Sequence, residues 1–246
     1  MTLRIVAIIP VRFASQRLPG KPLLPIAGKP MIQHVYERAL LARLDEVVVA
    51  TDDQRIYDVV KKFGGHVVMT DQNHPSGTDR VAEAAAGLTA DVVVNIQGDE
   101  PLLDANAVNA AITPFLEDNA LVMSTLAHEI TQDDDIRDPN AVKVVCDTRG
   151  FALYFSRSPI PYFRHKGQGS AKVYRHIGLY VFRHHFLTTF AALPPTDLEQ
   201  CEGLEQLRAL EHGYRIRVVP TDHAAIGVDT MEDYKKVCHL LENGEP

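Results

Sequence analysis

The feature that most constrains the fold is an alternation of apolar runs and helical segments near the N-terminus. The apolar runs are rich in Val and Ile, and they occupy residues 4–10, 46–51, 66–70 and 90–97. Longer segments with helical periodicity follow them, at residues 29–44, 53–64, 76–88 and 103–118. Strands that are apolar throughout, and that alternate with helices, are typical of a parallel sheet covered on both faces. The sequence therefore predicts a three-layer α/β sandwich with a mostly parallel sheet.

Two of the predicted helices begin at recognisable capping residues. Ser76 precedes an Ala-rich segment, and Thr230 precedes the last helical segment at 231–243. Short hydroxyl side chains are favoured at the N-cap, and the acidic Glu232 and Asp233 lie in the first turn, where negative charge is favourable.

The pattern changes in the second half of the chain. Residues 141–155 contain two strand-like runs joined by the turn 147–150 (DTRG), which predicts a hairpin. Residues 172–182 form another long apolar run with no helix before it. We therefore expect an antiparallel excursion over roughly 121–183 within a single domain of residues 1–246. The remaining expected elements are helices at 184–193 and 197–213 and a strand at 216–220.

Composition and charge exclude several classes of protein. The chain is 46% hydrophobic, and its net charge of −7 argues against nucleic acid or an anionic membrane surface as the main partner. Cys146, Cys201 and Cys238 are scattered, so they form neither a disulfide framework nor a zinc motif and fit a reducing compartment. No apolar run approaches the length of a membrane helix, and the first run is too short for a signal peptide. We expect a cytoplasmic protein.

Polar side chains follow the predicted strands at the point where each strand ends. In open α/β sheets, ligands bind beyond the carboxyl ends of the strands. The loops there bring together, at one edge of the sheet, Arg12, Arg17, Lys21, Asp52, Arg80, Gln97, Asp99 and Glu100. Cations and carboxylates at one edge suit a phosphorylated ligand with a hard divalent metal ion.

The loop after the first strand, IIPVRFASQRLPGKPL at residues 8–23, is rich in cations. Its Gly-Lys pair is also found in P-loops, but Pro22 follows where that motif has Ser or Thr. Arginine forks match phosphate oxygens and lysine supplies a point charge, so Arg12, Arg17 and Lys21 could hold a triphosphate. The alternative is a solvated loop whose cations contact only water.

Two carboxylates are candidates for the metal ion. Asp99, in VNIQGDEP, follows a buried strand and a glycine, so its side chain should reach the edge of the sheet. Asp229, in GVDT, offers a second carboxylate in similar surroundings. Mg²⁺ is commonly bound by one or two carboxylates together with substrate phosphates. The alternative for both residues is a structural cap, of the next turn or of the last helix.

Ser76–Arg80 (SGTDR) has a functional and a structural interpretation. A helix N-terminus can receive an anion or a base edge, but ordinary capping explains the same residues. His176 and Tyr180 share one face of the strand at 172–182, where a structural role is the default.

The segment 197–213 is predicted as one helix with an apolar stripe. The stripe is made of residues three positions apart, namely Leu198, Cys201, Leu204 and Leu207. Acidic residues recur with the same spacing, at Glu199, Glu202 and Glu205. We expect most of these carboxylates on a solvated face, with one of them available to a site.

Taken in order, these segments resemble one known family, the 3-deoxy-manno-octulosonate cytidylyltransferases (CMP-Kdo synthetases) of lipopolysaccharide assembly. The resemblance runs from Ile5 to about Leu240. It rests on the motifs IIPVRFASQRLPGKPL, GKPMIQHV, VVVATDD, HPSGTDR, VNIQGDEP, DPNAVKVV, ALYFSRSPIPY, RHIGLYVF, LEQLRAL and GVDT. Each motif alone is weakly specific, whereas the ordered set is highly specific.

The resemblance implies a fold and a reaction. The fold is that of a nucleotidyltransferase of the GT-A, Rossmann-like kind, with a homodimer built through the antiparallel excursion. The anomeric hydroxyl of 3-deoxy-D-manno-octulosonate (Kdo) attacks the α-phosphorus of CTP, pyrophosphate leaves, and CMP-Kdo forms for bacterial lipopolysaccharide synthesis. The resemblance also implies Mg²⁺ held by Asp99 and Asp229.

It further assigns roles to individual residues. The catalytic set is Arg12, Lys21, Asp99 and Asp229. The CTP-binding set is Arg12, Ser15, Arg17, Lys21, Ser76, Gly77, Thr78 and Arg80. The sugar-binding set is Gln97, Arg157, His176, Tyr180, Glu205 and Gln206. A cation is needed for the Kdo carboxylate, and Arg157 or a protonated His176 could supply it. No general base is apparent.

Two alternatives stay open. A cytidylyltransferase for another acidic sugar, such as sialic acid, would share the phosphate-binding loop, although SRSPIPY together with RHIGLYVF favours Kdo. A non-catalytic nucleotide-binding module on the same scaffold is the second, because fold alone does not fix function. The intact pair of Asp99 and Asp229 argues against that module.

Overall fold

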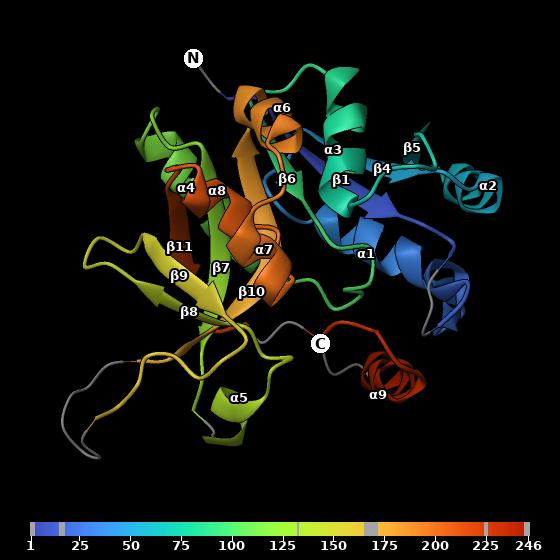
Figure 1. The fold of residues 1–246 in the computed structure, drawn as a ribbon. Helices are drawn as coiled ribbons and strands as arrows, with labels where there is room; N and C mark the ends of the chain where they lie inside the picture. Colours follow the sequence, from blue (N-terminus) through green and yellow to red (C-terminus); the bar gives the residue numbers. More distant parts are fainter. Residues whose placement is uncertain (1–2, 15–17, 132, 165–171, 224–225, 244–246) are drawn as a thin grey trace. The chain divides into compact units, whose positions relative to one another are not determined.

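The computed structural model describes residues 3–14, 18–131, 133–164, 172–223 and 226–243, and Figure 1 shows its helices and strands. The chain divides into two compact units. The first unit comprises Met1–Asn109, Phe182–Ala191 and Ala225–Pro246, and the second comprises Ala110–Val181 and Ala192–Ala224. The single domain that the sequence predicts over residues 1–246 stays a prediction.

A parallel sheet forms the centre of the first unit. Its strands lie in the order β6 (Val92–Asn95), β1 (Ile5–Val11), β4 (Glu46–Thr51) and β5 (His66–Met69). In register, Val6 of β1 lies opposite Val93 on one side and Glu46 on the other. β6 is buried along its whole length, and so is nearly all of β1, because both faces of the sheet are covered. The predicted parallel sheet is confirmed.

The longer helices of the described chain bear out two of the predicted capping residues. They are α1 (Met31–Ala39), α2 (Gln54–Lys62), α3 (Gly77–Ala86), α4 (Ala105–Glu117), α6 (His184–Ala192) and α9 (Met231–Glu242). The Ser76 hydroxyl accepts a hydrogen bond from the Asp79 backbone N–H at 3.2 Å, and Thr230 accepts one from Asp233 at the same distance. Both residues therefore cap their helices as predicted.

The connection from β1 to α1 contains short elements that the sequence pattern does not predict. These are a 3₁₀ turn, η1 (Lys21–Leu23), and a hairpin of β2 (Pro25–Ile26) and β3 (Lys29–Pro30). Gly20 precedes η1 with φ 69°, a left-handed conformation that favours glycine. This turn fixes the place of Lys21.

The second unit contains the predicted antiparallel pairing. β8 (Lys143–Cys146) pairs antiparallel with β9 (Ala152–Ser156), and β10 (Tyr174–Arg183) pairs antiparallel with β8. β7 (Met123–Glu129) lies beside β10 and pairs in parallel with β11 (Ile216–Pro220). A short helix, α5 (Asp133–Arg137), lies between β7 and β8. The Gly150 backbone N–H donates to the Asp147 carbonyl at 2.9 Å, which confirms the hairpin turn.

The prediction of one helix over 197–213 is wrong. The structure has two, α7 (Asp197–Glu202) and α8 (Leu207–Glu211), because Gly203 adopts φ 62° and ends α7. The predicted apolar stripe is lost with the break. Leu204 and Leu207 are buried, whereas Leu198 and Cys201 are exposed.

A hydrophobic cluster in the first unit packs the C-terminal helix beside the entry to α1. Its buried members are Leu18, Ile26, Met31, Leu102, Val228 and Val237. The Val228 backbone N–H donates to the Asp99 carbonyl at 2.9 Å. Segments far apart in the chain are thereby held together where the candidate site lies. Within the part of the chain that the structure describes, no helix is long and apolar enough to cross a membrane.

Candidate active site

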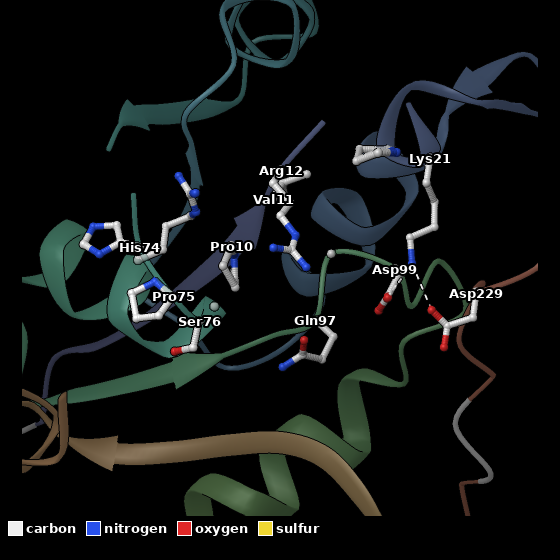
Figure 2. Close-up of a pocket in the computed structure, with 14 residues that line it drawn as sticks. Pro10, Val11, Arg12, Lys21, His74, Pro75, Ser76, Gln97, Asp99 and Asp229 are labelled. Carbon is white, nitrogen blue, oxygen red and sulfur yellow. Dashed lines mark hydrogen bonds and ion pairs between the residues drawn. The ribbon is translucent and has the colours of Figure 1, made fainter. Parts of the chain in front are cut away.

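A pocket of about 460 Å³ lies in the first unit, at the carboxyl ends of β1 and β6 (Figure 2). It is lined by Pro10, Val11, Arg12, Lys21, Pro22, His74, Pro75, Ser76, Gly77, Arg80, Gln97, Gly98, Asp99 and Asp229. The loops after β1, β5 and β6 all contribute, as expected for a ligand site in an open α/β sheet.

Lys21 joins the two predicted metal-binding carboxylates. Its Nζ lies 2.7 Å from Asp99 Oδ2 and 3.3 Å from Asp229 Oδ1, and Figure 2 shows its side chain extending toward both. The Lys21 side chain is only 11% exposed, so this ammonium is largely shielded from water. The structure thus brings Asp99 and Asp229 together around one cation.

Close packing fixes the loop that carries Asp99. A Cβ on Gly98 would lie 2.9 Å from Val11 Cγ2 and 3.0 Å from the Pro10 carbonyl oxygen, so only glycine fits against the end of β1. Burial, together with the charge of Asp99, raises the pKa of Glu100 to about 8. At neutral pH Glu100 is therefore mostly protonated.

The opposite side of the pocket carries Arg80 and the start of α3. Ser76, Gly77 and Arg80 line the pocket, as the resemblance implies. Thr78 is not among the lining residues; it is buried, and its hydroxyl accepts a hydrogen bond from Asn95 Nδ2 at 3.4 Å. Asp52, expected at the same edge, accepts from Arg80 Nη2 at 2.8 Å.

Of the remaining predicted ligand contacts in the first unit, some line the pocket and others lie outside the described residues. Arg12 is exposed, lines the pocket and makes no ion pair with any described residue. Ser15 and Arg17, both predicted CTP contacts, lie outside the described residues. Gln97, predicted on the sugar side, lines the pocket beside Gly98.

His74 is a lining residue that sequence patterns alone do not single out. Its Nε2 lies in hydrogen-bonding contact with Glu83 Oε2, and this contact holds the pKa of Glu83 below its usual range. Its position in the loop after β5 is the signal that could have found it, because that loop also carries Ser76.

Arg157, predicted to bind sugar, lies in the second unit in a frame of backbone carbonyls. Its guanidinium donates to the carbonyls of Glu202 at 2.7 Å, Pro139 at 3.0 Å and Gly203 at 3.4 Å. The buried Lys143 ammonium donates to the Arg157 carbonyl at 2.6 Å. Both ends of this arginine are therefore fixed.

His176, Tyr180 and Glu205 gather in the second unit. The rings of His176 and Tyr180 lie 5.4 Å apart, and burial, together with the charge of Glu205, raises the pKa of Tyr180. Burial lowers the pKa of His176 to about 3. Burial therefore favours a neutral His176 in the free protein, and its predicted role toward the sugar carboxylate stays a prediction.

The hydrogen bonds of Thr125 define the tautomer of His176. The Thr125 hydroxyl lies 2.8 Å from the Leu179 carbonyl and 2.9 Å from His176 Nε2. A hydroxyl has one hydrogen, which the carbonyl must receive, so the Thr125 oxygen accepts from His176 Nε2–H. The neutral imidazole then leaves Nδ1 as an acceptor.

Gln206 carries a buried donor that has no hydrogen-bond partner among the described residues. The residue is 3% exposed, and its Nε2 makes no hydrogen bond to any described residue. Buried polar atoms are nearly always paired, so an unpaired one marks a place where a ligand atom or a water molecule fits. Two of the three glutamates with helical spacing have partners of their own. Glu199 pairs with Arg208 at 2.6 Å, and Glu202 accepts a hydrogen bond from Ser156 Oγ at 2.6 Å.

Cytidylyltransferases are among the known proteins of similar sequence and structure. Residues 6–216 match the family model described as Cytidylyltransferase. A 3-deoxy-manno-octulosonate cytidylyltransferase from Geobacter sulfurreducens is 54% identical, covering 98% of this chain and 100% of its own. A protein of the same name from Syntrophotalea carbinolica is 56% identical, and the match covers 96% of this chain and 98% of that protein. Among solved structures, a CMP:2-keto-3-deoxy-manno-octonic acid synthetase complexed with CTP has a TM-score of 0.93 at 45% identity, covering 98% and 99%.

Proposed function

The chain belongs to the cytidylyltransferase family, among the 3-deoxy-manno-octulosonate cytidylyltransferases, and we propose that it transfers CMP from CTP to Kdo and releases pyrophosphate. The observation that carries this proposal is the convergence of Lys21, Asp99 and Asp229 in one pocket. Nucleotidyl transfer needs neutralised phosphate oxygens and a stabilised leaving group, and this end of the pocket supplies both charge types.

The phosphate end of CTP is assigned to the cationic side of the pocket. Arg12 and Lys21 would neutralise the phosphate oxygens, with Ser15 and Arg17 of the same loop as further contacts. Cations that face the charge developing on pyrophosphate lower the barrier for its departure, and they act more strongly where water is excluded. The shielded position of Lys21 in η1 supports that role.

The cytidine end is assigned to the start of α3. Ser76, Gly77 and Arg80 line that side of the pocket, and Thr78 supports the same turn from its buried position. Backbone N–H groups at a helix start and a guanidinium are donors, which suits the acceptor atoms of a pyrimidine edge and a ribose.

Asp99 and Asp229 are proposed to hold Mg²⁺. The described residues contain no cluster of three or more metal-binding side chains, so substrate oxygens would complete the coordination. The pair fits a cation, because the Lys21 ammonium already sits within 3.3 Å of both carboxylates. When bound, Mg²⁺ would neutralise phosphate charge and act as a Lewis acid at this end of the pocket.

Kdo binding is proposed for Gln97 in the first unit and for five residues of the second. Those five are Arg157, His176, Tyr180, Glu205 and Gln206. A cation for the sugar carboxylate and paired donors and acceptors for its hydroxyls are what such a ligand requires. Among these residues, only Arg157 supplies a full positive charge at neutral pH, because His176 is neutral. The group that removes the proton from the attacking hydroxyl is not among the assigned roles.

A cellular setting and an assembly follow from the same proposal. The product would serve bacterial lipopolysaccharide synthesis in the cytoplasm. The antiparallel strands of the second unit would form the interface of a homodimer. Exposed apolar residues on and after β9, namely Leu153, Tyr162 and Phe163, support an interface there.

The decisive experiment measures pyrophosphate release. Wild-type protein with CTP, Mg²⁺ and Kdo should release pyrophosphate and form CMP-Kdo, whereas N-acetylneuraminate in place of Kdo should not. Turnover with N-acetylneuraminate but not with Kdo would favour the sialic acid alternative. CTP binding without turnover on either sugar would favour a non-catalytic module.

The metal assignment has its own test. Asp99→Asn should keep CTP binding and lose most turnover, because one carboxylate of the pair is gone while the phosphate cations stay. Undiminished Mg²⁺-dependent turnover in that variant would contradict the assignment.

A further inference from the structure

Two side chains from neighbouring strand ends hold the guanidinium of Arg80. Asp52 follows β4 and accepts from Nη2 at 2.8 Å, and Thr70 follows β5 and accepts from Nη1. The side chains of Arg80 and Asp52 are 5% and 18% exposed, so the pair is mostly removed from water. Arg80 nevertheless lines the pocket. The orientation of the Arg80 guanidinium is therefore set by two residues that do not line the pocket themselves.

The ion pair gives the pocket two electrostatically different sides. The charge of Arg80 is compensated at close range by Asp52 in a poorly solvated place, where such compensation is strong. Arg12, in contrast, makes no ion pair with any described residue. An anion would gain more from Arg12 than from Arg80.

A compensated guanidinium keeps its hydrogen-bond donors. Arginine has five N–H donors and no acceptor, and Asp52 and Thr70 engage one each in the described structure. The other donors can still meet an uncharged acceptor. Cytosine presents such acceptors, a carbonyl oxygen and a ring nitrogen, so the nucleobase fits this side of the pocket better than a phosphate does.

We propose that Asp52 and Thr70 are positioning residues that aim Arg80 at the nucleobase, and that Asp52 reserves Arg80 for the uncharged base by compensating its charge. This inference rests on the proposed use of CTP. It predicts that changes at Asp52 or Thr70 alter recognition of the base and leave recognition of the phosphates intact.

The test separates the two ends of CTP with two probes. Cytidine carries the base without phosphate, and tripolyphosphate carries the phosphates without a base. Each is titrated against the full-length protein as a competitor of CTP. The variants are Asp52→Asn, Thr70→Val and Arg80→Gln. Asp53→Asn is the matched control, because it makes the same change one residue away and asparagine can still cap α2.

In Asp52→Asn, cytidine should bind roughly tenfold more weakly, the loss expected for a hydrogen bond to a charged group. Tripolyphosphate should bind as before or more tightly, because the charge of Arg80 is no longer compensated. Thr70→Val should weaken cytidine binding less than Asp52→Asn does, because it leaves the ion pair of Arg80 and Asp52 in place. This variant therefore still tests the positioning of Arg80 if Asp52→Asn folds poorly. Asp53→Asn should change neither affinity.

A double variant tests whether Asp52 acts through Arg80. In the Arg80→Gln background, Asp52→Asn should cause no further loss of cytidine affinity. Equal losses for cytidine and tripolyphosphate in Asp52→Asn would overturn the inference, as would an unchanged cytidine affinity. Both results leave the proposed function standing. Wild-type protein that binds CTP but no cytidine would overturn this inference alone, whereas wild-type protein that releases no pyrophosphate would overturn the proposed function and this inference with it.

Discussion

The ammonium of Lys21 lies 2.7 Å from Asp99 and 3.3 Å from Asp229, the two carboxylates that are proposed to hold Mg²⁺. A divalent cation held by the same two carboxylates would be repelled by the Lys21 ammonium, so the two cations would compete for them. Nucleotide phosphates are the groups that would draw Lys21 away. Metal binding and nucleotide binding should therefore be coupled.

Lys21→Met should raise the affinity for Mn²⁺ in the absence of nucleotide by at least about tenfold, equivalent to about 1.4 kcal/mol. The same variant should bind CTP more weakly, because a phosphate cation is lost. Electron paramagnetic resonance of free Mn²⁺ measures the first effect, and calorimetry with CTP measures the second.

Lys29→Met provides the control for Lys21→Met. Lys29 is exposed and pairs with Glu37 at 2.6 Å, away from the two carboxylates, so its loss should change neither affinity. Mn²⁺ binding that is equal in wild type and in Lys21→Met would contradict the coupling.

Gly98→Ala should lower kcat by roughly ten- to a hundredfold, the size of loss that a misplacement of about 1 Å can cause. The added Cβ would clash with Val11 Cγ2 at 2.9 Å and with the Pro10 carbonyl, so the loop carrying Asp99 must shift. Steady-state kinetics give kcat, and a thermal melt shows whether the fold is kept.

Gly87→Ala is the matched change for Gly98→Ala. A Cβ on Gly87 would meet only the Ala84 carbonyl, at an ordinary 3.8 Å, and its φ is −88°. Its kcat should equal that of the wild type. If Gly98→Ala also kept wild-type kcat, close packing of this loop would not be what places Asp99.

The sequence predicted the strands and the loops at their ends because local patterns encode both. Buried strands of β1 and β6 read as continuous Val and Ile runs, and a polar loop must follow each. The edge of the sheet then gathers Arg12, Lys21, Arg80 and Asp99 without any knowledge of distances.

Partnerships across the chain could not be predicted in the same way. Lys21 pairs with Asp229, which is 208 positions away, and only the packing of α9 brings them together. The neutral state of His176 depends on burial by distant segments, which a single strand pattern does not report. The break at Gly203 was missed because the flanking Leu spacing continues through it.

Gln206→Met should raise the KM for Kdo by roughly tenfold without lowering stability. The Nε2 of Gln206 is buried and unpaired among the described residues, so removing it frees the protein from a desolvation cost of about 1–3 kcal/mol. A loss of sugar affinity with equal or higher melting temperature is the combination that identifies a ligand-binding donor.

Gln200→Met serves as the comparison for Gln206→Met. Gln200 is exposed on α7, and the same substitution there should affect neither KM nor melting. A Gln206→Met protein with a lower melting temperature and an unchanged KM would assign Gln206 to the core instead of the sugar site.

His176 should make the stability of the protein depend on pH. Its pKa is about 3 in the folded protein and 6.5 in the unfolded chain, so the unfolded chain binds more protons between these values. The free energy of unfolding is therefore unaffected by the titration of this residue above pH 6.5, and it falls as the pH is lowered below that value. The slope should approach about 1.4 kcal/mol per pH unit within that window.

Replacing His176 by Gln isolates this contribution from the protonation of carboxylates at the same pH. Glutamine can still donate to the Thr125 hydroxyl but does not titrate, so the free energy of unfolding should fall less steeply between pH 6 and pH 4 than in the wild type. Urea unfolding at several pH values gives the two slopes. His185→Gln, a change of an exposed histidine at the start of α6, should keep the wild-type slope. If the free energy of unfolding depended on pH equally in wild type and in His176→Gln, the imidazole would be solvated enough to accept a proton without unfolding. A protonated His176 could then contribute to binding the Kdo carboxylate.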